Sequence, residues 1–368
     1  MDKDFSERLK KIEDVLLKAL PEQYSDKWKS DSFGSIPESI SSIHLDMLEK
    51  PCLNLLTLGG KRWRPLLLVL CAEMTAKKTA QSKAHEEKLI ENAYHLTPLV
   101  EFTHTASLIH DDIEDNADMR RGKPAAHITF GNDTAINAGS WLYFEAPVCI
   151  NTLDASQDLK NSLYKLYTQE LRRLHLGQAM DILWHRMPDL IPTEEEYKAM
   201  VQNKTGTLAS LAVQTGILAA GGSEETAKKA GAIAAQIGVG FQILDDVQNL
   251  TTGNPGKLRG DDIVENKKSL PLLLHLKQFP EQKEKIAELM TKAAKEGIKS
   301  PAVEQCIALM DKGGQIRNSY ELGLSLIKTY TEKLSKLYPE NGDSSDTENN
   351  PEISDISRLF AGIVSSVK

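Results

Sequence analysis

Residues 104–127 read HTASLIHDDIEDNADMRRGKPAAH, and this stretch joins an apolar helical turn to a dense group of acidic side chains. Asp111 and Asp115 are four positions apart, so on an α-helix their carboxylates lie on one face with Cβ atoms about 5–6 Å apart. Asp112 lies beside them. Such crowding of negative charge is unfavourable without a cation, and carboxylate oxygens are the ligands that Mg²⁺ prefers. An isolated acidic cluster is more often a solvated helix end, but the arginine pair that follows favours a binding site.

A second acidic pair occurs in GVGFQILDDVQNL, residues 238–250. Asp245 and Asp246 end an apolar helical run, and Asn249 occupies the position that Asp115 fills in the first motif. An amide oxygen can accept a hydrogen bond from a metal-bound water. We therefore expect the two motifs to face each other across a cavity and to hold metal ions between them.

Basic groups accompany both acidic motifs. In GGKRWRP, Lys61 and Arg64 are three positions apart at a helix start that begins with two glycines. Backbone N–H groups and the helix dipole also favour an anion there. Lys204 lies in a Lys-Thr-Gly segment that interrupts a long helical pattern. A lysine alone is usually a solvated surface charge, but these cations together indicate two bound polyphosphates, one held through Mg²⁺ and one directly by Arg and Lys.

The hydrophobic periodicity is helical throughout. A helix is predicted over residues 4–20, where apolar residues recur at steps of three and four, and a second after Pro37, a first-turn proline. Thr193 and Glu196 have the spacing of a capping box and predict a helix start. Strand patterns are scarce. The sequence therefore predicts an all-α fold, with residues 21–35 as a loop between the first two helices.

Composition excludes several classes of protein. The chain has 368 residues, 40% of them hydrophobic, and a formal charge of −8. This acidic balance disfavours a general nucleic-acid binder. The longest apolar run, Pro65–Ala72, is too short to span a membrane, the N-terminus lacks a secretory signal, and the four cysteines lack the spacing of a zinc site. We expect a cytoplasmic protein without a membrane span.

The C-terminal region has two parts. Residues 339–352, PENGDSSDTENNPE, are nearly devoid of apolar side chains and are expected to form a polar connector. Residues 353–368 carry an apolar stripe and predict an amphipathic helix packed on the same domain. Residues 1–338 are expected to form that single all-helical domain.

The motifs together resemble those of the all-trans isoprenyl (polyprenyl) diphosphate synthases. The matching stretches are GGKRWRP (59–65), HTASLIHDDIEDNADMRRG (104–122), GQAMD (177–181), KTG (204–206), FQILDD (241–246) and GKLRGDDIVENKKSLP (256–271). The wording is most similar to that of eukaryotic-type geranylgeranyl diphosphate synthases, in which an Asn at position 249 is normal. Asn266 departs from the family pattern, which usually has Gly before the lysine, and this puts the role of Lys267 in question.

The resemblance implies a large orthogonal helix bundle around a deep central cavity, the isoprenoid synthase fold, assembled as a homodimer. It implies condensation of an allylic diphosphate with isopentenyl diphosphate to give a linear all-trans product, with about three Mg²⁺ ions stabilising the leaving pyrophosphate. The alternatives are a longer-chain polyprenyl diphosphate synthase, a class I terpene cyclase and a non-catalytic synthase subunit. A cyclase needs a different second metal motif, and a non-catalytic subunit is expected to have lost aspartates that this chain retains.

The resemblance also implies roles for individual residues. The metal ligands are Asp111, Asp115 and Asp245. The catalytic set adds Asp112 and Lys204. Isopentenyl diphosphate is bound by Lys61, Arg64, His104 and Arg121. The allylic diphosphate is bound by Arg120, Lys204, Thr205, Gln242 and Lys257.

Product length depends on the helix turn that precedes the first acidic motif. Ala106 and Ser107 lie about one turn before Asp111, and a turn rises roughly 5.4 Å, close to one isoprene unit. Both residues are small, so the growing tail is expected to pass them, with geranylgeranyl diphosphate as the product. The expected floor residues of this pocket are Trp141, Tyr143 and Phe144.

Overall fold

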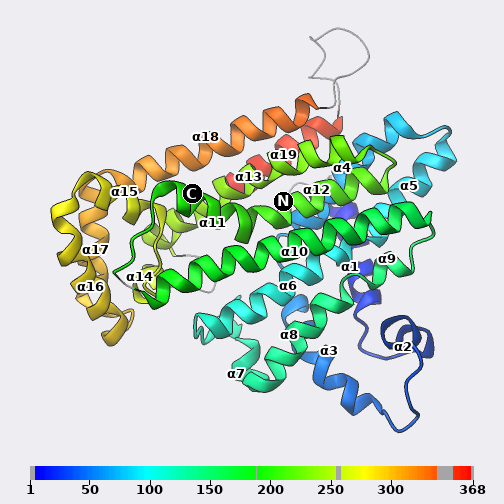
Figure 1. Ribbon diagram of the computed structural model, residues 1–368, viewed down its shortest axis with the longest axis horizontal. Coiled ribbons are helices and arrows are strands. Elements are labelled where there is room, and N and C mark those ends of the chain that lie inside the picture. The colour runs from blue at the N-terminus through cyan, green and yellow to red at the C-terminus, as the bar shows by residue number, and fades with distance from the viewer. Residues whose placement is uncertain (1–4, 188, 254–257, 338–350, 366–368) are drawn as a thin grey trace. The chain divides into compact units, whose positions relative to one another are not determined.

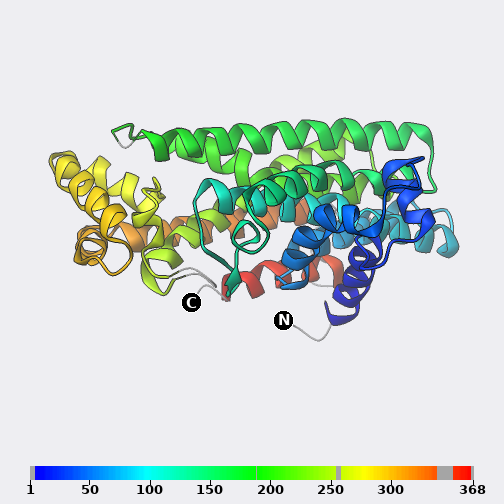
Figure 2. The same ribbon diagram turned by 90° about the horizontal axis from the view of Figure 1, so that it is seen from below.

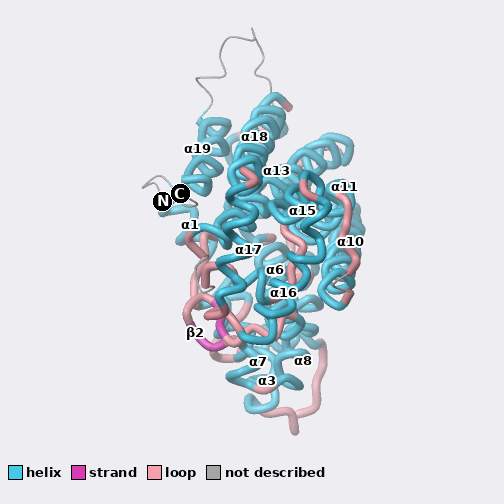
Figure 3. The backbone as a smooth tube through the Cα atoms, turned by 90° about the vertical axis from the view of Figure 1, so that its left-hand side faces the viewer, coloured by secondary structure: helices cyan, strands magenta, loops and turns pink. Residues whose placement is uncertain are grey.

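The computed structural model describes residues 5–187, 189–253, 258–337 and 351–365, with side chains from residue 355 onward in the last segment. Within these residues the chain consists of helices, connecting loops and one short β-hairpin, drawn in magenta in Figure 3. The prediction of an all-α fold is confirmed.

The elements up to the second acidic motif have the following bounds: α1 (Ser6–Ala19), α2 (Asp26–Phe33), α3 (Ser42–Thr57), α4 (Trp63–Thr79), α5 (Lys83–His95), α6 (Thr97–Glu114), β1 (Met119–Arg120), β2 (Lys123–Pro124), α7 (Ala126–Phe130), α8 (Asn132–Glu145), α9 (Val148–Asn151), α10 (Gln157–Arg186), α11 (Glu194–Val201), the π-helix η2 (Gln202–Gly206), α12 (Thr207–Ala219) and α13 (Glu224–Thr251). The remaining elements are α14 (Asp261–Val264), α15 (Leu270–Gln278), the 3₁₀-helix η3 (Pro280–Gln282), α16 (Lys283–Glu296), α17 (Pro301–Lys312), α18 (Gln315–Lys336) and α19 (Pro351–Ser365).

The chain divides into two compact units. Unit 1 comprises Met1–Glu170, Ser210–Gly231 and Ser335–Leu359, and unit 2 comprises Leu171–Ala209, Ala232–Leu334 and Phe360–Lys368. The first acidic motif and the GGKRWRP stretch belong to unit 1. The KTG segment and the second acidic motif belong to unit 2. The assignment of residues 1–338 to one domain stays a prediction.

Unit 1 is built on helices that approach each other closely. The apolar run of α4 is fully buried from Leu66 to Ala72. A Cβ on Gly216 would lie 2.2 Å from the carbonyl oxygen of Leu68, so only glycine lets these backbones meet. The same close approach occurs between α6 and α8 (Figure 1), where a Cβ on Gly139 would lie 2.9 Å from the ring of His110. These contacts fix α6, which carries the first acidic motif.

Unit 2 has two groups of buried apolar side chains. One gathers around α11, α13 and α15 and includes Tyr197 and Ile243. The other joins α13 and α15 to α14, α16, α17 and the start of α18, and Figure 2 shows α16 and α17 side by side. A Cβ on Gly238 would lie 2.7 Å from the Cα of Gly206, so the π-helix that contains KTG is pressed directly against α13.

Several sequence predictions are confirmed at the level of single helices. The periodic pattern of residues 4–20 forms α1, and Ile12 and Leu16 are fully buried. The capping box is present, because Thr193 and Glu196 bond each other's backbone N–H groups at the start of α11. A helix also forms at residues 351–365, burying Ile356 and other apolar side chains. Most of the predicted connector, residues 339–350 of 339–352, lies outside the described residues.

Two predictions about the N-terminal region are wrong. Pro37 is not in the first turn of a helix, because α3 begins at Ser42. Residues 21–35 are not a loop throughout, because they contain α2, capped by the Ser25 hydroxyl. Trp28 is the buried residue of this polar helix, and its ring contacts that of Trp141, with centroids 6.5 Å apart.

Candidate functional site

The first acidic motif forms the C-terminal end of α6. Asp111 and Asp115 are partly exposed, whereas Asp112 is buried. Carboxylates are unfavourable at a helix C-terminus, where the dipole is negative. Arg120 compensates for them, since its Nε donates to Asp112 Oδ1 at 2.7 Å and its Nη2 lies 3.4 Å from Asp111 Oδ2. Burial would lower the pKa of Arg120, but Asp112 and Asp111 outweigh it and raise the pKa, so the guanidinium stays charged.

The GGKRWRP stretch forms a turn that receives Arg121. Gly60 has φ +152°, and a Cβ there would lie 3.0 Å from Arg121 Nη2, so the glycine makes room for the guanidinium. Arg121 Nη1 donates to the carbonyl oxygen of Gly59. Lys61 follows as an exposed side chain. The turn therefore brings together Arg121 and Lys61, both predicted to bind isopentenyl diphosphate.

Arg64 and His104 form a second pair of the predicted residues. Arg64 Nη1 lies 3.5 Å from His104 Nε2. Burial and the charge of Arg64 lower the pKa of His104 from 6.5 to about 4, so the imidazole is neutral at pH 7. A neutral imidazole beside an arginine can donate a hydrogen bond to an anion without adding repulsion between two cations.

Arg62 supports this cationic group and was not among the predicted site residues. Its backbone is left-handed, with φ 45°. Its side chain is 2% exposed and pairs with Glu13 at 2.6 Å and with Glu101 at 2.7 Å. Glu101 Oε1 lies 3.7 Å from His104 Nδ1. Arg62 thus ties the start of α4 to α1 and to the helix that carries His104.

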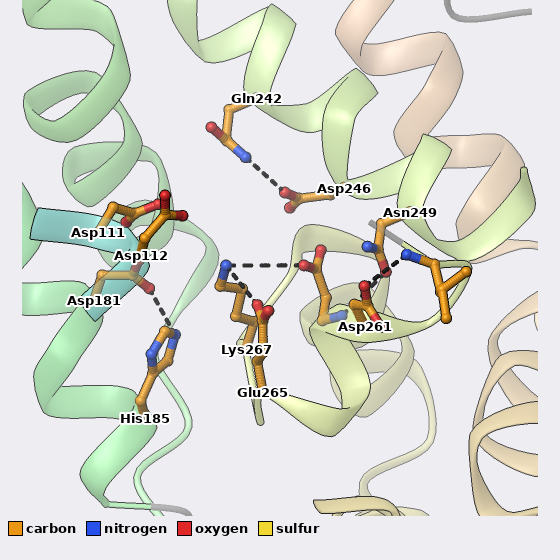
Figure 4. Close-up of polar contacts among 12 residues, drawn as sticks. Asp111, Asp112, Asp181, His185, Gln242, Asp246, Asn249, Asp261, Glu265 and Lys267 are labelled. Atoms are coloured by element: carbon orange, nitrogen blue, oxygen red, sulfur yellow. Dashed lines mark hydrogen bonds and ion pairs between the residues drawn. The ribbon is translucent and has the colours of Figure 1, made fainter. Parts of the chain in front are cut away.

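In unit 2 the KTG segment lies against α10. Lys204 Nζ donates to Asp181 Oδ2 at 2.6 Å, and His185 Nε2 lies 3.1 Å from the other carboxylate oxygen (Figure 4). Burial opposes ionisation of Asp181, but Lys204 and His185 lower its pKa below the ordinary value. A Cβ on Gly177 would lie 2.3 Å from the backbone nitrogen of Lys204. GQAMD and KTG, separate in the sequence, are thus one structural feature.

The two aspartates of the second motif have different surroundings. Asp245 is exposed and Asp246 is 6% exposed. Asp246 accepts a hydrogen bond from the Tyr197 hydroxyl at 2.6 Å. It also accepts one from the Gln242 amide at 3.1 Å (Figure 4). Gln242 in turn accepts a hydrogen bond from the Thr205 hydroxyl at 3.0 Å. The predicted residues Thr205 and Gln242 are therefore in direct contact.

Asn249 does not have the surroundings that the sequence suggested. Its side chain is fully buried, and its Oδ1 accepts the backbone N–H of Asp262 at 3.2 Å. The amide oxygen therefore holds the first turn of α14 and is not turned toward solvent, where a metal-bound water would lie.

Asn266, where the family usually has Gly, adopts a backbone conformation that glycine also favours. Asn266 has φ 60°, a left-handed conformation that asparagine tolerates better than most residues. The next residue, Lys267, pairs with Glu265 at 2.8 Å and lies 3.9 Å from Asp262 (Figure 4). The predicted residue Lys257 lies outside the described residues.

The predicted chain-length residues differ in exposure. Ala106 is fully buried, whereas Ser107 is partly exposed. Leu108, which the sequence analysis did not select, is also partly exposed and shares a helix face with Asp111 three positions later. Among the expected floor residues, Tyr143 stacks on His110 with ring centroids 5.5 Å apart. Phe144 is 78% exposed, so it is not a floor residue within the described chain.

Four residues at the site were not selected from the sequence. Glu101 lies beside the predicted residue His104 and pairs with Arg62. Tyr197 contacts Asp246, and His185 contacts Asp181. The spacing of Tyr197 from Lys204 gives no signal, because the π-helix Gln202–Gly206 breaks the α-helical register between them. Among the described residues, no group of three His, Cys, Asp or Glu side chains is arranged to hold a metal ion. No described helix is long and apolar enough to cross a membrane.

Comparison with known proteins identifies the family. The sequence pattern of the Polyprenyl synthetase family matches residues 45–310, and the chain therefore belongs to this family of enzymes.

Two curated relatives illustrate the range of similarity. The chain is 39% identical over 209 residues to a geranylgeranyl pyrophosphate synthase of Neocamarosporium betae, an alignment that covers 56% of this chain and 58% of the relative. It is 34% identical over 267 residues to a short chain isoprenyl diphosphate synthase of Methanocaldococcus jannaschii, covering 72% of this chain and 76% of the relative. Against the first relative, the chain thus spans less than two thirds of the relative's length.

A solved structure agrees with the fold. The polyprenyl synthase from Caulobacter crescentus CB15, complexed with calcium and isoprenyl diphosphate, superposes with a TM-score of 0.73 at 22% identity. The superposition covers 99% of this chain and 96% of the other. The chain therefore has the all-α isoprenoid synthase fold that the resemblance implied.

Proposed function

We propose that the protein is a Mg²⁺-dependent prenyltransferase that condenses an allylic diphosphate with isopentenyl diphosphate. The observation that carries this proposal is that the cations predicted for the two diphosphates have different surroundings. Arg64 lies beside the neutral His104, and Arg121 lies against the glycine turn just before Arg64, as expected of a site that binds a diphosphate directly. Arg120 and Lys204 are each bound to carboxylates, as expected where a metal and a diphosphate share one site.

The donor set fits a hard divalent cation. Asp111 and Asp115 are partly exposed carboxylates one helical turn apart, and Asp245 is exposed on its own helix. These three residues would hold Mg²⁺ together with oxygens of the allylic diphosphate. When bound, Mg²⁺ supplies charge stabilisation for the leaving diphosphate. The chain's own contribution is to fix these carboxylates on helices, Asp111 and Asp115 at the end of α6 and Asp245 within α13.

Lys204 and Arg120 add positive charge at the departing diphosphate. Lys257 is proposed for the same role from the family resemblance. Thr205 and Gln242 would line the electron-poor allylic group, because their oxygens offer negative dipole ends without a strong nucleophile. Lys61, Arg64, His104 and Arg121 would hold the diphosphate of isopentenyl diphosphate.

The experiment that tests this function is incubation of the purified protein with isopentenyl diphosphate, each allylic starter and Mg²⁺, followed by sizing of the products. Asp111→Asn and Asp245→Asn are expected to lower kcat by several orders of magnitude, with an unchanged far-UV circular dichroism spectrum. Asp311→Asn, an exposed aspartate on α17, is the matched control and should retain full turnover. Normal turnover of Asp245→Asn would contradict the two-motif metal site, and a cyclised hydrocarbon would indicate a terpene cyclase.

We propose geranylgeranyl diphosphate as the product, with a longer prenyl chain as the alternative. The Ser107 hydroxyl donates to the carbonyl oxygen of His104 at 2.8 Å, so its hydrogen is satisfied within the helix and needs no acceptor from an apolar tail. Ala106 and Ser107 leave room for the tail at this level. Ser107→Phe is expected to shorten the product to farnesyl diphosphate with turnover retained. An unchanged product length in this variant would show that the tail does not pass Ser107.

A homodimer is the proposed assembly. Unit 1 exposes large apolar side chains on three neighbouring helices: Ile43 and Met47 of α3, Ile128 of α7, and Ile136 and Phe144 of α8 are each between 47% and 78% exposed. These helices pack on one another, and exposed apolar side chains gathered on neighbouring elements are typical of an interface. Phe144→Glu is expected to convert the dimer to a monomer in light scattering after size exclusion, whereas Leu17→Glu on α1 should not. A dimer that persists in Phe144→Glu places the interface elsewhere.

A further inference from the structure

Asp246 has donors at both carboxylate oxygens. Its Oδ2 accepts the Tyr197 hydroxyl at 2.6 Å and the backbone N–H of Leu270 at 3.0 Å. Its Oδ1 accepts Nε2 of Gln242 at 3.1 Å. These groups come from α11, from the start of α15 and from the preceding turn of α13. Asp246, within the second acidic motif, therefore joins three elements of unit 2, and Figure 4 shows its contact with Gln242.

This arrangement sets the direction of the Gln242 amide. An ionised carboxylate has acceptors only, so Gln242 must turn its NH₂ group toward Asp246. Its carbonyl oxygen then faces Thr205, whose hydroxyl donates to it at 3.0 Å. With its hydrogen engaged in this way, the Thr205 oxygen retains its lone pairs for other partners.

We propose that Asp246 is a positioning residue that fixes the Gln242 amide, and through it the Thr205 hydroxyl, so that oxygen lone pairs face the electron-poor allylic group. Tyr197 and the Leu270 N–H hold Asp246 in the orientation that this requires. The inference rests on the proposed prenyl transfer, because it assigns work to Thr205 and Gln242 in that reaction. It separates Asp246 from its neighbour Asp245, which is exposed and is proposed to hold metal.

The alternative role for Asp246 is direct metal binding beside Asp245. Adjacent residues on a helix are rotated by about 100°, and Asp246 is buried where Asp245 is exposed. Three hydrogen bonds to one carboxylate also leave little capacity for a cation. The geometry therefore favours the positioning role, and metal binding is an outcome that the experiment can detect.

Asp246→Asn is the decisive variant. The Leu270 N–H requires an acceptor, so it holds the new carbonyl oxygen at the Oδ2 position and directs the new NH₂ group toward Gln242. Gln242 must then turn over, presenting its own NH₂ group to Thr205 and forcing the hydroxyl hydrogen into the site. Preorganised dipoles aimed at developing charge are worth large factors in rate. We expect kcat to fall at least about 10-fold, with KM for both diphosphates within about 3-fold of the wild type.

A double-mutant cycle with Gln242→Met distinguishes the mechanism from loss of charge. Methionine has no amide to turn over, so Asp246→Asn should lower kcat by less than about 2-fold in the Gln242→Met background. Loss of a metal ligand or of a nearby negative charge would instead lower kcat by the same factor in both backgrounds, and would also raise the Mg²⁺ concentration for half-maximal rate. That result would overturn the inference.

Tyr197→Phe provides a second measurement if Asp246→Asn does not fold. It removes one donor to Asp246 and is expected to lower kcat by about 3- to 10-fold, again only when Gln242 is present. Tyr24→Phe is the matched control, since Tyr24 donates to Asp46 at 2.8 Å in unit 1, and it should leave kcat unchanged. Unchanged kcat in Tyr197→Phe would also overturn the inference. The failure of the proposed function itself would differ, because the wild-type protein would then show no condensation.

Discussion

Replacing Arg62 by methionine is expected to destabilise the protein more than any exposed substitution, because it leaves a buried carboxylate without its guanidinium. The side chains of Arg62 and Glu101 are 2% and 3% exposed, and they pair at 2.7 Å. Arg62 also pairs with Glu13 and donates to the carbonyl oxygen of Leu56 at 2.5 Å. Removing one partner of a buried ion pair costs about 3–5 kcal/mol. We expect a loss in that range in the free energy of unfolding.

Urea unfolding at constant pH, followed by circular dichroism, measures this loss. The double variant Arg62→Met/Glu101→Gln should recover a large part of it, because no unpaired charge then remains buried. Arg317→Met is the control, since Arg317 and Glu321 form an exposed pair, 83% and 58% exposed, worth at most about 0.5 kcal/mol. If Arg62→Met lies within about 1 kcal/mol of the wild type, the network does not hold α4 in the way described.

Three further predictions concern the site. Lys61→Met should raise KM for isopentenyl diphosphate at least about 10-fold more than KM for the allylic substrate, and Lys204→Met should do the reverse; equal effects on both substrates would reject the assignment of the two subsites. The pKa of His104 is lowered to about 4, so the unfolded chain takes up a proton first and stability should fall as pH drops from 6.5 to 4. This fall should be smaller in His104→Gln when both proteins are unfolded by urea across that range, and identical pH profiles would contradict it. Gly177→Ala should reduce soluble expression or lower the melting temperature sharply, because its Cβ would lie 2.3 Å from the Lys204 nitrogen; a normal melting temperature would show that α10 and η2 can separate without cost.

The sequence predicts helices where apolar spacing or a cap is strong enough to act locally. In α1 the buried residues recur at helical spacing, and at α11 the Thr193 hydroxyl and the Glu196 carboxylate satisfy backbone donors within one turn. The helix α2 lacks such a signal, because Trp28 is its buried residue. Another side chain of α2, Phe33, stacks on Trp141 of α8, and the two rings are nearly parallel with centroids 6.2 Å apart. A contact between residues so far apart in the sequence is invisible to periodicity.

In the candidate site, too, some residues can be found from the sequence and others cannot. The acidic and basic motifs can be found in the sequence because neighbouring charges on one helix face are costly and therefore informative. Their supporting partners come from distant segments. Tyr197 and Asp246 are 49 residues apart, and Arg62 and Glu101 are 39 residues apart. These partners depend on tertiary packing, so the motifs alone do not reveal them.

Both acidic motifs contain adjacent aspartates. The family resemblance names only the first of each pair as a metal ligand, and charge alone does not distinguish the two. Helix geometry does, because consecutive side chains point about 100° apart. In each motif the first aspartate is at least partly exposed, while Asp112 and Asp246 are 1% and 6% exposed. Each buried carboxylate is held by donors of its own unit, Arg120 for Asp112 and the Tyr197 hydroxyl for Asp246. A carboxylate desolvated in this way needs those donors to remain ionised. In each pair the second aspartate is therefore held by the residues around it, and the first is the one that we propose to meet the ligand.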